Sequence, residues 1–184
     1  MFNADLPLSS NRWPVVRLVA GSRTEVTLLS SAFFALTTHW NKCTLPCSGS
    51  DCRLCEILPS RGLFYAAVMC GSRVSILELG AQSAGHFEQH VKLLHGGMRP
   101  GLVVALSRKG AKSPVRSEVI REVAGSVEVP MLELAAHVMA LYKFPCPNPG
   151  EPMEKYELRC RSIATVRCNR AAGLLLDARE RQLR

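Results

Sequence analysis

The sequence lacks any apolar run that approaches the roughly 20 residues needed for a membrane-spanning helix. It also opens without the cationic, apolar leader of a secreted protein, because Asp5 lies among the first residues and Pro7 follows it. Disulfide scaffolds belong to the oxidising compartments that such a leader reaches, so the eight cysteines are expected to be reduced. These absences predict a soluble, cytoplasmic protein.

Catalytic signatures are missing as well. The chain has no Walker loop, no Gly-x-Ser-x-Gly motif and no dinucleotide-binding fingerprint. His86 and His90 have the spacing of metalloprotease ligands, but Phe87 stands where that motif requires a glutamate. A zinc deaminase would need Pro-Cys-x2-Cys after a His-x-Glu, whereas four residues separate Cys47 from Cys52 and no His-x-Glu precedes them. We therefore expect a protein that is not an enzyme.

Acidic residues are scarce relative to basic ones. Asp and Glu number 15 against 23 Lys and Arg, which gives a formal net charge of +8. An excess of this sign favours a polyanionic partner such as nucleic acid. The length of 184 residues and the hydrophobic content of 47% suit one ordinary domain with an appendage.

Cysteine, by contrast, is concentrated in one stretch. Four of the eight cysteines fall within the thirteen residues from Cys43 to Cys55. Cys52 and Cys55 have the Cys-x2-Cys spacing that delivers two thiolates to Zn²⁺ from one tight turn, and Cys47 adds a third. The fourth ligand is either His39, which would join the site to the body of the domain, or Cys43. We call residues 39–55 the cysteine loop and predict that it is a zinc-binding insertion.

The hydrophobic pattern around this loop predicts a chain of strands with one helix between them. Segments with strand character are 15–20, 24–29, 33–40, 62–69, 73–79, 102–106 and 115–123. A helix is expected over 82–95, where Ala84, Phe87, Val91 and Leu94 form one apolar stripe before Gly96 and Gly97. A second helix should begin at Pro130 and end before Pro145. The pattern predicts a mainly β or α+β fold with C-terminal helices.

Prolines suggest how the chain is divided. Residues 1–12 read as a flexible arm, and 145–152 contain four prolines, which is typical of a linker. The expected body is 13–144, and 153–184 is expected to be a basic helical tail. The order of strands and the helix within 13–144 matches an OB-like, partly open barrel, a fold that commonly binds oligonucleotides.

At this point the chain resembles the zinc-containing single-stranded-DNA-binding proteins of the T-even phage type. In that family an OB-like core carries a zinc loop with one histidine and three cysteines, the last two as Cys-x2-Cys. The matching order here is His39, Cys47, Cys52 and Cys55. The resemblance covers residues 37–65 and the coarse strand order, and the ligand spacings differ. It departs from the family at the C-terminus, which is basic rather than acidic.

The resemblance implies a non-enzymatic protein that binds single strands, DNA more readily than RNA. Such proteins combine a cationic groove with aromatic side chains on which bases stack. Trp40 and Tyr65 flank the cysteine loop as candidate stacking residues. Candidate phosphate contacts are Arg61, Arg108, Lys109, Lys112 and Arg116. The alternative is a protein-interaction module that docks a partner through the cysteine loop and the C-terminal tail.

Overall fold

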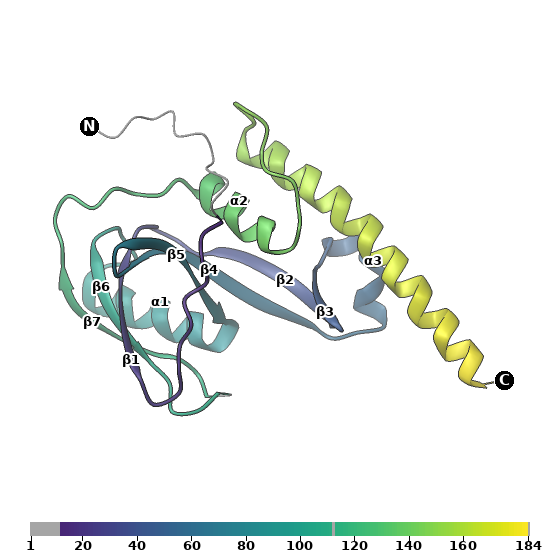
Figure 1. Ribbon diagram of the computed structural model, residues 1–184, viewed down its shortest axis with the longest axis horizontal. Coiled ribbons are helices and arrows are strands. Elements are labelled where there is room, and N and C mark those ends of the chain that lie inside the picture. The colour runs from purple at the N-terminus through teal and green to yellow at the C-terminus, as the bar shows by residue number, and fades with distance from the viewer. Residues whose placement is uncertain (1–11, 112, 184) are drawn as a thin grey trace.

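A computed structural model describes residues 12–111 and 113–183, and their fold is mixed α+β around one antiparallel sheet (Figure 1). The predicted arm therefore lies outside the described residues, apart from Arg12. The sheet has seven strands, in the order β3-β2-β4-β1-β6-β7, with β5 on the other edge of β4. The strands are β1 (Arg23–Leu28), β2 (Phe34–Asn41), β3 (Cys43–Pro46), β4 (Ser60–Cys70), β5 (Arg73–Gly80), β6 (Leu102–Ser107) and β7 (Arg116–Glu122).

Strand β4 is the longest and connects the two halves of the sheet. Its first half pairs with β2, while its last residues pair with β1 on the same edge. Its other edge pairs with β5 through a two-residue turn in which Gly71 has φ +60°, a value that favours glycine. In the described part of the chain β7 pairs with β6 alone, so the sheet is open.

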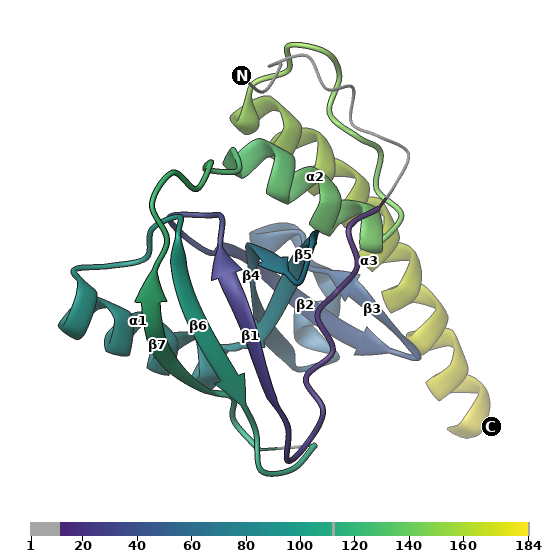
Figure 2. The same ribbon diagram turned by 60° about the vertical axis from the view of Figure 1, so that its left-hand side comes forward.

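Helix α1 (Ala81–His95) covers one face of the sheet, and Figure 2 shows it behind β1, β6 and β7. It ends where predicted, because Gly96 takes the left-handed conformation at φ +76°. Ala84, Phe87 and Val91 are buried against Val26, Leu28 and other core residues. The predicted stripe is wrong at its last position, because Leu94 is 64% exposed.

Helix α2 (Met131–Leu141) covers the opposite face of β4 and β5. Leu134 and Val138 pack there against Tyr65, Ala67 and Ile76. The hydroxyl groups of Tyr65 and Tyr142 lie within hydrogen-bonding contact of each other. Burial, together with that hydrogen bond, raises the pKa of Tyr65 well above its ordinary range. The sheet is therefore enclosed between α1 and α2 at its centre.

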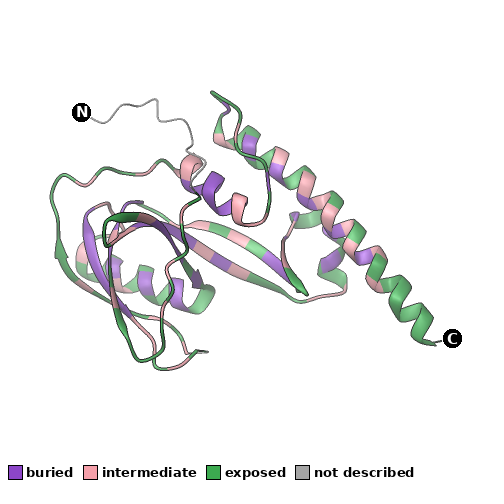
Figure 3. Cartoon of the chain, in the orientation of Figure 1, coloured by how far each residue is buried: buried purple, intermediate pink, exposed green. Residues whose placement is uncertain are grey.

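Helix α3 (Met153–Leu183) runs past the end of the sheet and along the cysteine loop (Figures 1 and 3). Its buried residues recur at every fourth position: Tyr156, Cys160, Ala164, Cys168 and Ala172. Four of these five side chains are small, which lets the helix approach its neighbours closely. The first half of the stripe packs on α2, and Cys168 and Ala172 pack on Cys52 and Leu54 of the loop.

The proline-rich segment 145–152 is held against α3 by polar contacts. Glu151 is 6% exposed, pairs with the Arg159 guanidinium at 2.6 Å and accepts a hydrogen bond from the Asn148 amide. The Tyr156 hydroxyl donates to the Pro145 carbonyl. Whether residues 13–144 fold without the tail stays a prediction, but the tail is in contact with both α2 and the cysteine loop.

The Glu151–Arg159 pair leads to a pH-dependent expectation. The hydrogen bond from Arg159 lowers the pKa of Glu151 below its ordinary value of 4.5. A depressed carboxyl pKa contributes stability that is present above 4.5 and is lost as the pH falls below it. Glu151→Gln should therefore lose less melting temperature than the parent between pH 5 and pH 3. The control is Glu154→Gln, at an exposed position in the first turn of α3, and equal pH profiles for both variants would contradict the assignment.

Two further differences from the sequence expectations have local causes. Residues 15–20 form no strand, and only Val15 makes a bridge, to Ile76 at the outer edge of β5. Every second residue of this segment is exposed, namely Val15, Arg17 and Val19, so the segment buries too little apolar surface to be held as a full strand. Strand β3 was not expected, because Cys43 to Pro46 read as part of an irregular loop. None of the helices in the described residues is both long and apolar enough to cross a membrane.

Candidate metal centre

The sheet positions the first residue of the centre. His39 lies near the end of β2, opposite Leu45 of β3, and is fully buried. The tight connection between the two strands is made by Lys42, which has φ +57°. Strand β3 then returns the chain beside β2, and the Cys47 amide donates to the Thr37 carbonyl at 2.8 Å. This pairing holds Cys47 close to His39.

Two short 3-10 turns position the other cysteines. The first, Gly49–Asp51, begins at Gly49 with φ +85°, and the second, Arg53–Glu56, contains Cys55. The Cys55 amide donates to the Cys52 carbonyl at 3.0 Å, which closes the Cys-x2-Cys turn. Leu54 between the two cysteines is completely buried and anchors the turn.

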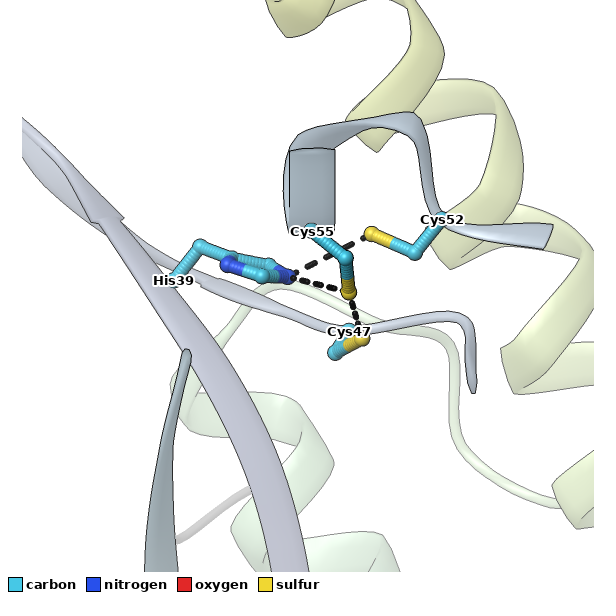
Figure 4. Close-up of side chains that lie close together, drawn as sticks. All are labelled: His39, Cys47, Cys52 and Cys55. Atoms are coloured by element: carbon cyan, nitrogen blue, oxygen red, sulfur yellow. Dashed lines mark hydrogen bonds between the residues drawn. The ribbon is translucent and has the colours of Figure 1, made fainter. Parts of the chain in front are cut away.

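The four side chains converge on one point, as Figure 4 shows. Their ligand atoms all lie within 4.8 Å of one another. The His39 Nε2 atom is 3.4 Å from Cys52 Sγ and 3.5 Å from Cys55 Sγ, and Cys47 Sγ is 3.6 Å from Cys55 Sγ. A tetrahedral zinc site has edges of about 3.8 Å between sulfurs and about 3.5 Å between sulfur and nitrogen, given its usual bond lengths. The cluster therefore has the size of a tetrahedral metal site and could hold such an ion.

The second nitrogen of His39 also has a partner. Nδ1 is 3.4 Å from the Pro59 carbonyl, so a proton on Nδ1 can be donated there. That arrangement leaves the Nε2 lone pair free and directed at the sulfurs, as is usual for a histidine that ligates a metal.

The thiols differ in acidity because their surroundings differ. Burial raises the pKa of Cys47 to about 12. At Cys52 burial opposes ionisation, but the hydrogen bond from the Ser48 backbone and the polar contact with the Cys168 side chain outweigh it and lower the pKa to about 6. Cys52 therefore ionises more readily than Cys47, and a bound cation would have to displace the proton of Cys47.

Helix α3 packs against the cysteine loop next to the candidate metal centre. The thiol of Cys168 is fully buried and donates to the Pro46 carbonyl at 3.3 Å, one residue before Cys47. Burial raises the pKa of Cys168 to about 12, so it stays a neutral donor. The sequence did not single out Cys168 or Pro59. The spacing of four between Cys160, Ala164 and Cys168 was a visible sign of a helix packed through small residues.

The structure places His39, not Cys43, in the cluster. Cys43 is exposed at the start of β3 and is not a member of the group of four. Cys43 pairs with Asn41, whereas His39 pairs with Leu45, so Cys43 is displaced by two residues along the β2–β3 ribbon from the position of His39.

The predicted nucleic-acid contacts fall into separate places. Trp40 is 60% exposed at the end of β2, and Arg61 lies exposed on β4 beside it, with a hydrogen bond of 3.4 Å to Thr44, the cross-strand partner of Trp40. Lys109 and Arg116 are exposed, and Arg108 partly exposed, on the β6–β7 hairpin, at the other end of the sheet. Lys112 lies outside the described residues. The prediction that Tyr65 stacks on a base needs correction, because its ring is 0% exposed beneath α2.

The geometry thus defines a Cys3His centre on an open antiparallel sheet with helices on both faces. Comparison of the whole chain with known proteins finds no matching family model, no matching curated protein and no matching solved structure.

Proposed function

We propose that the protein is a zinc-stabilised nucleic-acid-binding protein that prefers single-stranded DNA and acts without catalysis. The observation that carries the proposal is the position of the exposed aromatic and cationic side chains in two particular connections of the sheet. One connection is the β1–β4 segment with the cysteine loop, and the other is the β6–β7 hairpin.

The strand order supports an OB-like plan. Strands β1, β4 and β5 form a meander, α1 follows, and β6 and β7 complete the set, with β6 pairing back to β1. In an OB barrel the connection between the first two strands and the connection between the last two strands flank the oligonucleotide site. Here β2, β3 and the cysteine loop occupy the first connection, and the basic hairpin tip is the second.

Trp40 in the first connection and Arg61 at the start of β4 form a suitable contact surface. A largely exposed indole offers a face to an unpaired base, and the neighbouring guanidinium offers a charge to the phosphate. In duplex DNA the bases are stacked on each other and cannot reach such a ring, which is the reason for the single-strand preference.

The second connection supplies cations without aromatic rings. Arg108, Lys109 and Arg116 lie at the β6–β7 tip, and Lys112 belongs to the same loop in the sequence. Since α2 covers the face of β4 and β5 that contains Tyr65, the proposed path uses the two connections and does not include Tyr65.

Zinc is the metal that suits the centre best. Three thiolates and one imidazole are soft or borderline donors, which favour Zn²⁺ over Mg²⁺ or Ca²⁺. The four ligands leave no open position for a reactive water, as in structural zinc sites.

Zinc affinity should rise with pH. The free Cys47 thiol, with a pKa of about 12, carries a proton at neutral pH that zinc binding must release. Each released proton strengthens binding about tenfold per pH unit. Chelator competition between pH 6.5 and 8.5 measures this, and calorimetry in two buffers counts the protons. An affinity that does not change with pH would show that Cys47 is not a ligand.

The function itself is tested by titrating the zinc-loaded protein with single-stranded and duplex oligonucleotides of the same sequence over a range of salt. Tight binding to the single strand alone supports the proposal. No binding of either at low salt would refute it.

A further inference from the structure

A fourth thiol lies against the candidate metal centre. Cys168 of α3 is fully buried, and its side chain is in polar contact with that of Cys52. Cys52, Leu54, Cys168 and Ala172 form one cluster of buried residues between the cysteine loop and α3. The buried α3 positions one turn before and after Cys168 are Ala164 and Ala172, so close packing here does not require a sulfur atom. Cys168 therefore adds chemical reactivity to this interface as well as volume.

The four thiols at this place form two contacting pairs. Cys47 Sγ and Cys55 Sγ are 3.6 Å apart within the cysteine loop. Cys52 and Cys168 form the second pair, which joins the loop to α3. A disulfide needs its two sulfur atoms about 2.05 Å apart, and thiols that are already in contact approach that distance by small side-chain movements. Each of the four thiols therefore has a neighbour to which it can be linked.

The first pair is open to solvent and the second is not. Cys55 is exposed and Cys47 is half-buried, whereas Cys52 is 4% exposed and Cys168 is completely enclosed. A small oxidant in solution therefore meets Cys55 first. Sulfur atoms that hold a metal ion are thiolates, and the thiolate is the form of cysteine that reacts with peroxides. This order of exposure predicts that oxidation begins at Cys55 and reaches the buried pair second.

We propose that these four thiols are a redox switch, which hydrogen peroxide converts into two disulfides with release of the metal ion. The Cys55 sulfur attacks the peroxide, an S–O bond forms as the O–O bond breaks, and hydroxide leaves. The Cys47 thiolate then attacks the Cys55 sulfur and displaces a second hydroxide, which completes the first disulfide. One peroxide molecule has then taken two electrons from the two sulfurs.

The second disulfide forms between Cys52 and Cys168 in the same way. A second peroxide molecule oxidises the Cys52 thiolate, and the hydroxide that is released takes the proton of the Cys168 thiol. The Cys168 sulfur then attacks the Cys52 sulfur and displaces hydroxide. The first disulfide removes two of the four metal ligands and the second removes a third, so only His39 remains. The metal ion therefore leaves, while the new bond keeps the loop attached to α3.

The experiment starts from the full chain with a measured zinc content, because the switch rests on the zinc binding proposed above and does not depend on nucleic acid. Hydrogen peroxide is added, and the zinc released is measured with a chromogenic chelator. We expect release of one Zn²⁺ per chain, and dithiothreitol with added zinc should restore the bound ion. A tryptic digest without reduction then identifies the disulfides by mass spectrometry.

The tryptic peptides separate the two disulfides. The cysteines of interest fall in three peptides: 43–53 with Cys43, Cys47 and Cys52, 54–61 with Cys55, and 168–170 with Cys168. We expect peroxide to join all three peptides together. A disulfide between Cys47 and Cys52, which are also in contact, would instead stay inside the first peptide. Because Cys43 belongs to that peptide too, the map is made on the Cys43→Ser variant.

Two buried cysteines of α3 give matched variants. Cys168→Ala removes the partner of Cys52, whereas Cys160→Ala makes the same change two turns earlier in the same buried stripe. Without Cys168, the oxidised Cys52 sulfur continues to the sulfinic acid, which dithiothreitol does not reduce. We therefore expect Cys168→Ala to release its zinc but to lose most of its capacity to rebind zinc after reduction. Cys160→Ala should rebind zinc like the parent.

Four results would overturn the switch: peroxide releases no zinc; it releases zinc without linking 43–53 to 168–170; its main product is a disulfide inside 43–53; or Cys168→Ala rebinds zinc as fully as the parent. If Cys168→Ala does not fold, the peptide map of the Cys43→Ser variant gives the decision. A chain that holds no zinc before oxidation would contradict the proposed zinc binding together with the switch. A chain that holds zinc and forms neither disulfide would contradict the switch alone.

Discussion

Chelation of zinc is expected to lower the melting temperature by about 8–16 °C and to release one Zn²⁺ per chain. Zinc present at about 1,000 times its dissociation constant stabilises the folded state by about 4 kcal/mol. For a chain of this size each kcal/mol corresponds to about 2–4 °C. The effect should extend beyond the loop, because Cys52 and Leu54 are packed directly on Cys168 and Ala172 of α3.

Single substitutions test which residues bind the zinc and contribute to the melting temperature. Cys52→Ser and His39→Ala should each reduce bound zinc and the melting temperature, since each removes one of four ligands. Cys43→Ser should change neither, because Cys43 lies outside the cluster. Zinc content is measured by atomic absorption and melting by calorimetry. A metal-free preparation that melts at the same temperature as the zinc-loaded protein would disprove the structural role of the metal.

Replacing Trp40 by alanine is expected to weaken binding to a single-stranded oligonucleotide by about 5- to 150-fold. Stacking of a base on an aromatic side chain contributes about 1–3 kcal/mol. Trp40 is exposed, so its removal should leave the melting temperature and the zinc content close to those of the parent. Leu93→Ala, at an exposed apolar position on α1 far along the chain from the cysteine loop, is the control for loss of apolar surface. Equal weakening by both variants would contradict a stacking role.

Salt dependence separates charge from stacking. The logarithm of the affinity should fall with the logarithm of salt concentration at about 0.7 per phosphate neutralised on a single strand. Changing Lys109, Lys112 and Arg116 together to alanine should flatten that slope, while Trp40→Ala should leave it unchanged. The same change at Arg170, Arg179 and Arg181 of α3 removes equal charge elsewhere. If both triple variants flatten the slope alike, binding depends on net charge and has no path along the hairpin.

Much of the fold could be predicted from the sequence, because several strands and helices have clear local patterns of apolar residues and glycines. The apolar run 62–69 and the segment 73–79 predicted strands β4 and β5, and the paired glycines after His95 predicted the end of α1. The short strand β3 gave no such signal. It forms because its four residues pair with the end of β2, and a pairing partner is not a property of the segment itself.

The residues of the candidate metal centre were also only partly predictable from the sequence. Cys-x2-Cys spacing is local, so Cys52 and Cys55 could be recognised from the chain alone. The choice of His39 over Cys43 depended on the β2–β3 register, which places His39 opposite Leu45. The burial of Tyr65 could not be predicted either. We expected an exposed aromatic side chain beside the cysteine loop, but Tyr65 lies under α2, which begins more than sixty residues later in the sequence.

The central place of β1 has a consequence during synthesis. β1 pairs with β6 from Arg23 opposite Ser107 to Thr27 opposite Val103, across roughly 80 residues of chain. At ribosomal rates of about 5–20 residues per second, its partner is completed roughly 4–16 s after β1 itself. During that interval β1, whose Val26 and Leu28 are buried in the folded protein, has no hydrogen-bonded partner along the edge that pairs with β6. Unpaired strand edges promote aggregation, so we expect the nascent chain to be prone to aggregation at β1 until β6 has left the ribosome and paired with it.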